Sequence, residues 1–213
     1  GRDGVVDDRN RPYSRASIHN WFVGRALDVL RPGGLVCFIT STYFLDESDA
    51  GMRAHVASEA DLVTAFRLPS GTFERIASTS VQADLVVLRK RAPGEAAAAA
   101  EWLDLDYVPK PMLREGCHEQ YLRINRWFVR HPQHVLGRID RVSNGFQAVP
   151  TAMLDGDLES ALLSAQALVP HGVYSVQPTA QAKVPRDIVA APAGTRPGSL
   201  VVSEGRIGIV EGD

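Results

Sequence analysis

The chain has 213 residues, of which 45% are hydrophobic and 23% charged, proportions that are ordinary for a globular protein with a substantial core. Its formal net charge of −2 excludes a global attraction to nucleic acid, so any DNA contact requires a local basic patch or another domain. No stretch approaches the ~18 apolar residues of a membrane span, and the widely separated Cys37 and Cys117 favour a reduced, cytoplasmic protein with no membrane partner.

The two ends of the sequence indicate a piece of a longer protein. The chain begins at Gly1 rather than at methionine, and it stops at Asp213 shortly after the strand-like residues 199–202. We therefore expect further residues on both sides.

The first predicted element is a helix that follows a polar loop over residues 1–16. Ser17 is a suitable N-cap, and Arg31-Pro32-Gly33-Gly34 ends the helix, because proline cannot continue it and glycine adopts the left-handed conformation beyond its end. The same glycines are a poor phosphate loop, since they precede a strand instead of opening a helix. Spacings of three and four predict one apolar stripe facing a core, formed by Ile18, Trp21, Phe22, Ala26, Val29 and Leu30.

Strands and a second helix follow in alternation. The apolar run over residues 35–40 predicts a strand buried on both faces, residues 48–59 a helix, and residues 62–68 and 81–88 two more strands. This alternation with short connections predicts an α/β layered sheet over residues 1–92.

The composition then changes. Residues 93–100 contain a glycine and five consecutive alanines and are interpreted as a linker. Residues 101–175 contain short amphipathic pieces and predict a mainly helical extension. Residues 176–213 combine a proline-rich connector with a β-hairpin that turns at Glu204-Gly205.

Two groups of side chains are candidates for chemistry. His131 and His134, with the nearby Cys117-His118, have spacings that suit a zinc site poorly, so structural or solvated histidines are favoured and no metal is expected. The segment from Phe73 to Ser80 joins two strands and is either a plain connection with Phe73 tucked into the core, or a loop that offers an aromatic face and hydroxyls to a planar ligand such as a flipped base.

Longer stretches, taken in order, carry a family resemblance. SIHNWFVGRALDVLRPGGLVCFITSTYFLD and DLVTAFRLPSGTFERIASTSVQADLVVLRKR resemble the later half of an adenine-N6 DNA methyltransferase domain, above all in the large methylase–helicase proteins of phages, plasmids and defence islands. INRWFVRHPQHVLG and DLESALLSAQALVPHGVYS are similar to the segments that lead such proteins toward a helicase region. The resemblance extends over residues 14–175.

The resemblance implies a partial Rossmann-like methyltransferase sheet with a mixed C-terminal extension. GLVCFITS would be its fifth strand, DLVTAFRLP its sixth and VQADLVVLRKR its seventh, antiparallel one. The implied reaction moves a methyl group from S-adenosylmethionine to N6 of an adenine flipped out of double-stranded DNA, in a restriction-modification or phage-defence protein with a fused or partner helicase. The cofactor-binding glycine motif and the Asn-Pro-Pro-aromatic tetrad of the family are absent, so both are expected upstream of Gly1 in a missing N-terminal half, and the chain alone is expected to be inactive.

Asn10-Arg11-Pro12-Tyr13 differs from that tetrad by one residue. Arg11 replaces a proline that fixes the loop, and it puts a cation where a methyl cation must approach. The preceding residues are too few and too charged for the buried strand that should present the loop. Asn10 and Tyr13 are therefore interpreted as a decoy, with a variant tetrad that uses another chain's cofactor site as the alternative.

The resemblance also names residues for the target base. The loop between the sixth and seventh strands helps hold the extruded adenine in related enzymes, which implies Phe73 and, second to it, Ser78 and Thr79. Tyr43 and Phe44 follow the end of a strand, where ligands of such sheets sit. A rival hypothesis makes the chain a non-catalytic module, derived from a methylase, that docks DNA or a partner.

Overall fold

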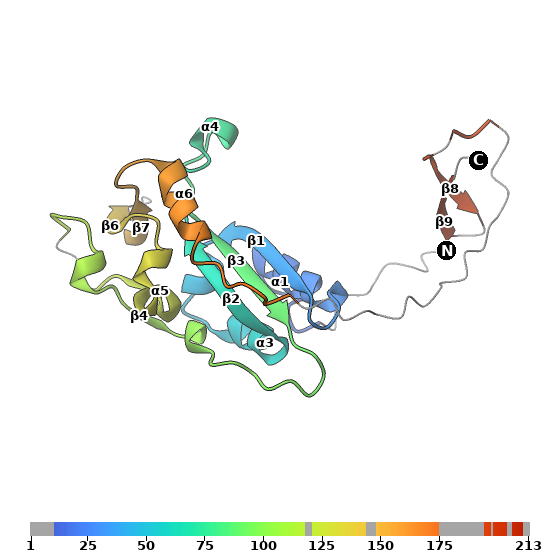
Figure 1. Cartoon of the computed structure of the whole chain (residues 1–213), viewed down its shortest axis with the longest axis horizontal. Coiled ribbons are helices and arrows are strands. Elements are labelled where there is room, and N and C mark those ends of the chain that lie inside the picture. Colours follow the sequence, from blue (N-terminus) through green and yellow to red (C-terminus); the bar gives the residue numbers. More distant parts are fainter. Residues whose placement is uncertain are drawn as a thin grey trace. The chain divides into compact units, whose positions relative to one another are not determined.

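The structure is a computed structural model that describes residues 11–117, 121–143, 148–174, 194–196, 198–203 and 206–210, and the chain divides into two compact units. One unit lies within Arg9–Val176. The described part of the other, beyond Gln177, contains β8 (Leu200–Ser203) and β9 (Arg206–Ile209), which pair antiparallel (Figure 1). These strands are those of the predicted hairpin, whose turn residues Glu204 and Gly205 lie outside the described residues.

The larger unit mixes helices and strands throughout. Its first part contains α1 (Ile18–Val29), β1 (Leu35–Ser41), α2 (Tyr43–Asp46), α3 (Gly51–Glu59), β2 (Ala60–Arg67), α4 (Glu74–Ala77) and β3 (Ala83–Lys90). Its second part contains η2 (Glu101–Leu103), β4 (Leu105–Tyr107), η3 (Lys110–Met112), β5 (Arg123–Asn125), α5 (Arg126–Arg130), η4 (Pro132–His134), β6 (Arg138–Ser143), β7 (Ala148–Met153) and α6 (Leu158–Gln166). No helix among the described residues is long and apolar enough to cross a bilayer.

The central sheet has three strands in the order β1-β3-β2. β3 pairs antiparallel with both neighbours, so β1 and β2 run parallel to each other and end at the same edge of the sheet. The three strands predicted from the sequence are confirmed, with β3 beginning and ending two residues later than expected. The prediction that residues 35–40 are buried on both faces is wrong, because Cys37 and Ile39 of β1 are exposed on a face that none of the described helices covers. The chain is thus a mixed α/β protein whose sheet is paired antiparallel.

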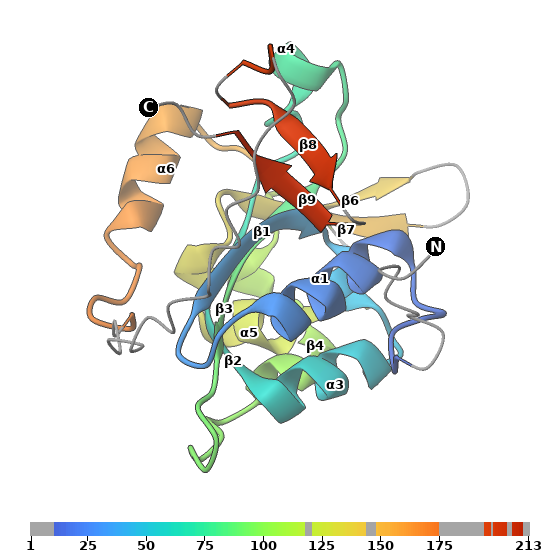
Figure 2. The same ribbon diagram turned by 90° about the vertical axis from the view of Figure 1, so that its right-hand side faces the viewer.

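Helices cover the two faces of this sheet unequally. α1 and α3 lie on one side and α6 on the other (Figure 2). On the first side, Val23, Leu27 and Val56 pack with Val86 and Leu88 in the main hydrophobic core. On the second side a smaller cluster forms where Ala161 and Ala165 of α6 meet Phe66, Leu85 and Leu68 of the β2–β3 region. The face of β1 on that second side remains open, and Ile39 is 59% exposed there.

The buried face of α1 is not the predicted one. The helix begins after Ser17 and ends before the Pro-Gly turn as expected, with Gly33 at a φ of 74°. However, its buried residues are Asn20, Val23, Gly24 and Leu27. Three members of the predicted stripe, Ile18, Phe22 and Val29, are largely exposed. These three residues face away from the core of this unit, whereas Leu30 at the end of the stripe packs against the core.

Residues on both sides of the predicted linker share one core. Trp102, Ile124 and Phe128 lie in the same cluster as the sheet residues Val86 and Leu88. Residues 101–175, for which the sequence favoured helical pieces, also contain the antiparallel pairs β4–β5 and β6–β7. Asn125 ties the two parts together, because its side-chain amide donates to the carbonyl of Leu45 at 2.7 Å and to that of Trp102 at 2.8 Å.

Candidate functional site

The candidate site lies where β1 and β2 end and β3 begins, which we call the carboxyl edge. Thr40 of β1, Asp84 of β3 and Arg67 of β2 occupy paired positions in the register, so their side chains share one face of the sheet. The short helix α2 follows β1 directly and brings Tyr43 and Asp46 to this edge. In open, mostly parallel α/β sheets ligands sit beyond the carboxyl ends of the strands, and β1 and β2, which run parallel on either side of β3, both end at this edge.

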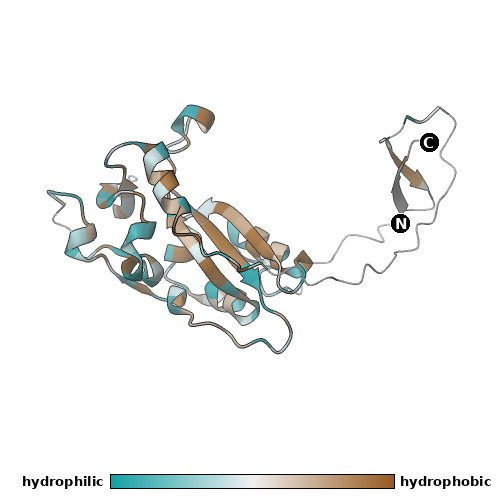
Figure 3. Cartoon of the chain, viewed as in Figure 1, coloured by the Kyte–Doolittle hydropathy of each residue, from teal (hydrophilic) through white to brown (hydrophobic). Residues whose placement is uncertain are grey.

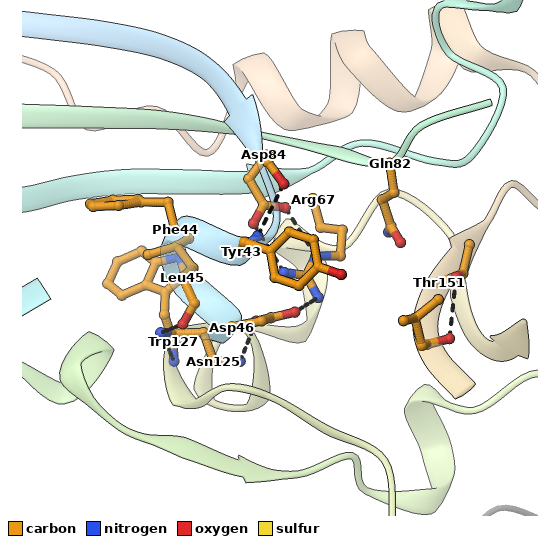
Figure 4. Close-up of polar contacts among 12 residues, drawn as sticks. Tyr43, Phe44, Leu45, Asp46, Arg67, Gln82, Asp84, Asn125, Trp127 and Thr151 are labelled. Carbon is orange, nitrogen blue, oxygen red and sulfur yellow. Dashed lines mark hydrogen bonds and ion pairs between the residues drawn. The ribbon is translucent and has the colours of Figure 1, made fainter. Parts of the chain in front are cut away.

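Arg67 is the centre of this edge and is fully buried. It donates two hydrogen bonds to Asp84, at 2.9 Å from Nε and at 3.0 Å from Nη2, in the forked geometry that suits a carboxylate (Figure 4). Its Nη1 lies 2.7 Å from Oδ2 of Asp46, an ion pair that does not meet the geometry of a hydrogen bond. The guanidinium also lies over the ring of Phe128, 4.5 Å from its centroid.

Burial and charge oppose each other in this network. Burial favours the neutral form of Arg67, but the carboxylates of Asp46 and Asp84 outweigh it, so the pKa of Arg67 is raised. Burial raises the pKa of Asp84 to about 6, against the attraction of Arg67 and with a further contribution from Asp46. Arg67 therefore remains a cation and holds β2, β3 and α2 in one arrangement. Such a network fixes geometry more than it adds stability.

Asp46 is held from a second side. Its Oδ1 accepts a hydrogen bond of 2.8 Å from the backbone amide of Asn125. The side chain of Asn125 in turn caps α5 by accepting from the amide of Trp127 at 3.0 Å. The end of α2, a short helix that begins at Tyr43, is thus fixed between the sheet and residues 101–130.

A stacked group of rings flanks Arg67 on the α5 side. His134 is buried and stacks on Phe66 with ring centroids 4.7 Å apart, and His131 stacks on Trp127 at 3.9 Å. Burial, with a smaller contribution from His131, lowers the pKa of His134. Cys117 is partly buried, and His118 lies outside the described residues. Within the part of the chain that the structure describes, no three potential metal ligands gather.

The β2–β3 loop begins at the carboxyl edge, and the structure places its predicted site residues as follows. Phe73 is half-buried and packs against the small cluster of Phe66, Leu136 and Ala165, which is the plain connection considered from the sequence. Ser78 is exposed and ends α4 with a left-handed φ of 49°. Thr79 Oγ1 accepts from the amide of Val81 at 3.3 Å.

Tyr43 and Phe44 have different environments although they are neighbours. Tyr43 is 49% exposed at the carboxyl edge and is free to meet a ligand. Phe44 is buried against Trp102, with centroids 6.4 Å apart, and cannot stack on an incoming ring. Tyr43 is therefore the aromatic side chain that this segment offers.

Tyr13 of the tetrad-like segment is a buried packing residue. Its hydroxyl donates to the carboxylate of Asp28, and its ring lies edge-on to Trp21 at 6.5 Å. The ring also fills the space beside Gly24, where a Cβ atom would come within 2.4 Å of it. Burial, followed by the bond to Asp28, raises the pKa of Tyr13. Asn10 lies outside the described residues.

Sequence reasoning missed the buried network. A signal was present, because Arg67 interrupts the apolar run of β2 and Asp84 opens that of β3. Charges within apolar runs are rarely buried unless they are paired. To identify Asp84 as the partner of Arg67, however, one must know the register of the strands. The role of Asn125 depends on its contact with Asp46, which lies 79 positions earlier in the chain.

Part of the chain is similar to a known phage protein. No protein-family model matches the chain, and no solved structure matches it. Over 99 residues the chain is 33% identical to the Defense against restriction protein B of Escherichia phage P1. The match covers 46% of this chain and 4% of the phage protein, so the chain spans only a small part of that relative's length.

Proposed function

We propose that this chain is part of a cytoplasmic DNA adenine-N6 methyltransferase that acts on an adenine flipped out of duplex DNA. The observation that carries the proposal is the direction of β3, which runs antiparallel between the parallel strands β1 and β2. This is the direction that the resemblance to the later half of such a domain requires of its last strand. The likeness to a phage protein named for defence against restriction supports a role in restriction-modification or phage defence.

The carboxyl edge supplies the target-base side of the proposed site. Tyr43 offers a half-exposed ring. The buried ion pairs of Arg67 with Asp46 and Asp84 hold α2, the helix that carries this ring, against the sheet. Stacking on an aromatic ring is a common way to hold a flipped base. Ser78 and Thr79, on the loop that follows β2, add hydroxyl groups at the same edge.

We assign the binding of S-adenosylmethionine, which supplies the methyl group, to residues outside this chain. The glycine turn that the structure describes, at Gly33-Gly34, precedes β1 and bonds to Lys90 instead of opening a helix at the end of a strand. The open edge of β1 and the exposed stripe of α1 are the surfaces on which a further part of the sheet would pack. A helicase would be a further region or partner of the same protein.

The test uses the protein translated from the complete reading frame, labelled S-adenosylmethionine and unmodified double-stranded DNA. We expect methyl transfer to N6 of adenine, and Tyr43→Ala should reduce the transfer by about fivefold or more, since stacking on a base contributes about 1–3 kcal/mol. The matched control is Tyr121→Ala. Tyr121 is an exposed tyrosine that precedes β5 in the chain, and its replacement should leave the rate unchanged. Equal rates for wild type and Tyr43→Ala would remove Tyr43 from the site.

The rival function, a module that docks DNA or a partner without catalysis, is favoured by one observation, the exposed apolar surface of α1 and β1. It predicts DNA or partner binding by the complete protein with no methyl transfer. Asn10→Ala addresses the variant-tetrad alternative, because loss of transfer in that variant would make Asn10 the acceptor of the amino group, and unchanged transfer would exclude it.

A further inference from the structure

The β2–β3 loop, residues 69–82, forms a finger that extends beyond the carboxyl edge (Figure 1). Its tip is the short helix α4, and Ile76 on that helix is 87% exposed. Arg75 and Glu74 beside it are exposed as well, so the tip carries no net formal charge. Figure 3 shows hydrophobic and hydrophilic residues next to each other on α4.

The finger is fixed at its base. The amide of Leu68 donates to the carbonyl of Ala83 at 3.0 Å, and the amide of Ser70 donates to that of Ala152 in β7 at 2.8 Å. The hydroxyl of Ser70 donates to the carbonyl of Ser80 at 3.2 Å and so ties the two arms together. Phe73 packs into the small cluster under α6 and anchors the first arm. The base of the finger is therefore anchored to β7 and to the small cluster, and its two arms are bonded to each other.

The tip also has a strained backbone. Ser78 ends α4 at a φ of 49°, a left-handed conformation that is uncommon for residues other than glycine. Such conformations cost on the order of 1 kcal/mol and cluster at ligand-contacting positions. Ser78 ends α4 two residues after the exposed Ile76 and is followed by two further hydroxyl residues, Thr79 and Ser80.

The surroundings of Ile76 indicate what it contacts. A protein interface of stable affinity has an extended apolar centre, whereas the exposed surface next to Ile76 is mixed and contains Arg75, Glu74 and Ser78 beside the small side chain of Ala77. A large aliphatic side chain on a projection that is anchored at its base, with guanidinium and hydroxyl neighbours that can bond to phosphate oxygens, suits insertion between base pairs. The anchored Phe73 has its ring committed to the protein core, so it is not the residue that the finger presents.

We propose that the finger is a wedge for duplex DNA, in which Ile76 enters the base stack and fills the space left when the target base is extruded. The proposal rests on the proposed function and deepens it, because it assigns Ile76 to base extrusion and Tyr43 to holding the extruded base. A wedge acts on paired, stacked DNA and is not needed when the base is already unpaired.

The experiment compares two duplexes of one sequence, selected as the sequence that the complete protein binds most tightly and containing a candidate target adenine. One is fully paired, and the other has an abasic position opposite the target adenine. For Ile76→Ala we expect binding and methyl transfer to fall about tenfold on the paired duplex and less than about threefold on the abasic one, because extruding an adenine that has no pairing partner costs less free energy. The control is Val81→Ala, an exposed aliphatic residue on the same loop, which should change neither.

The outcomes separate the two proposals. Equal losses on both duplexes, or no loss on either, would overturn the wedge while the wild-type transfer rate still supports the methyltransferase. Binding that depends on Ile76 in the expected way, with no methyl transfer by wild type, would overturn the methyltransferase and support the wedge. A wild-type protein that binds neither duplex would overturn both.

Discussion

Arg67 shows how a single residue can organise a site that sequence patterns do not reveal. Its three partners lie on β3, on α2 and on α5, and each belongs to a different stretch of the chain. The strand that carries it was predictable from its apolar run, but the bonding partner was not, because the partner depends on the antiparallel register that sets Arg67 opposite Asp84. The position of Tyr43 just past a strand end was predictable from the sequence, and its role in ligand contact stays a prediction.

The exposure of single side chains distinguishes the candidate ligand-contacting residues from residues that pack in the core. Phe44 and Tyr43 are equally aromatic in the sequence, yet one is buried against Trp102 and the other is half-exposed. The β2–β3 loop shows a similar contrast, because Phe73 packs against the small cluster and Ile76 is exposed. Loop residues have no periodicity from which an inward or outward direction can be read, which is why the sequence could nominate the loop but not its outermost residue.

His134 should make the stability of the fold sensitive to acid. Burial lowers its pKa below the ordinary 6.5. Below that pH the imidazole of His134 therefore binds a proton more readily in the unfolded chain than in the folded chain. The free energy of unfolding should therefore fall with decreasing pH, by at most about 1.4 kcal/mol per pH unit from this group. His134→Gln has no group that binds a proton at this position, so its free energy of unfolding should lack this decrease.

The measurement is urea unfolding of wild type and His134→Gln from pH 7.5 to pH 5. The titration of Asp84, whose raised pKa of about 6 acts in the opposite direction, is common to both proteins and cancels in the difference. We expect the stability of wild type relative to the variant to decrease as the pH falls below 6.5. A difference that stays constant over this range would show that His134 titrates alike in the folded and unfolded chains.

At the scale of elements, the helix α1 explains where periodicity succeeds and where it fails. Its bounds were predicted correctly from Ser17 and the Pro-Gly turn. Its buried face was wrong, because the core side includes Asn20 and Gly24, residues that no hydrophobic pattern selects. Gly24 is needed there to admit the ring of Tyr13. The exposed stripe retains three large apolar residues, Ile18, Phe22 and Val29, which indicates a second packing surface.

Asn125 offers a test of how the two parts of the larger unit are joined. Its buried side chain makes three hydrogen bonds, which cap α5 and bind the carbonyls of Leu45 and Trp102. Asn125→Ala would leave buried carbonyl groups without a donor, and we expect a loss of about 3 kcal/mol in the free energy of unfolding. The matched control is the exposed N-cap Asp157 of α6, where Asp157→Ala should cost about 1 kcal/mol. Chemical denaturation of both variants measures the difference, and equal losses would mean that Asn125 acts as a cap alone.

For the whole molecule, the distribution of apolar surface is the most informative property. α1 and α3 cover one face of the sheet, α6 covers part of the other, and β1 keeps an edge without a partner strand among the described residues. β1 contains no charged residue and no proline, the features by which proteins usually protect an edge strand. Together with the exposed stripe of α1, this edge is an apolar surface on which the further part of the sheet in the methyltransferase proposal would pack.

The open edge of β1 predicts that the 213-residue chain associates with itself when it is produced alone. Ile39 lies on this strand with 59% of its surface exposed, and Ile39→Lys places a charge that opposes edge-to-edge pairing. In sedimentation velocity over a range of concentrations, the wild-type chain should form dimers or larger species, and Ile39→Lys should shift the distribution toward monomer. Ile76→Lys is the matched control, because it introduces the same charge at a more exposed isoleucine that is far from the edge in sequence and lies on α4. Equal effects of the two substitutions would attribute the association to exposed apolar side chains in general, and a wild-type chain that stays monomeric would show that β1 is protected in some other way.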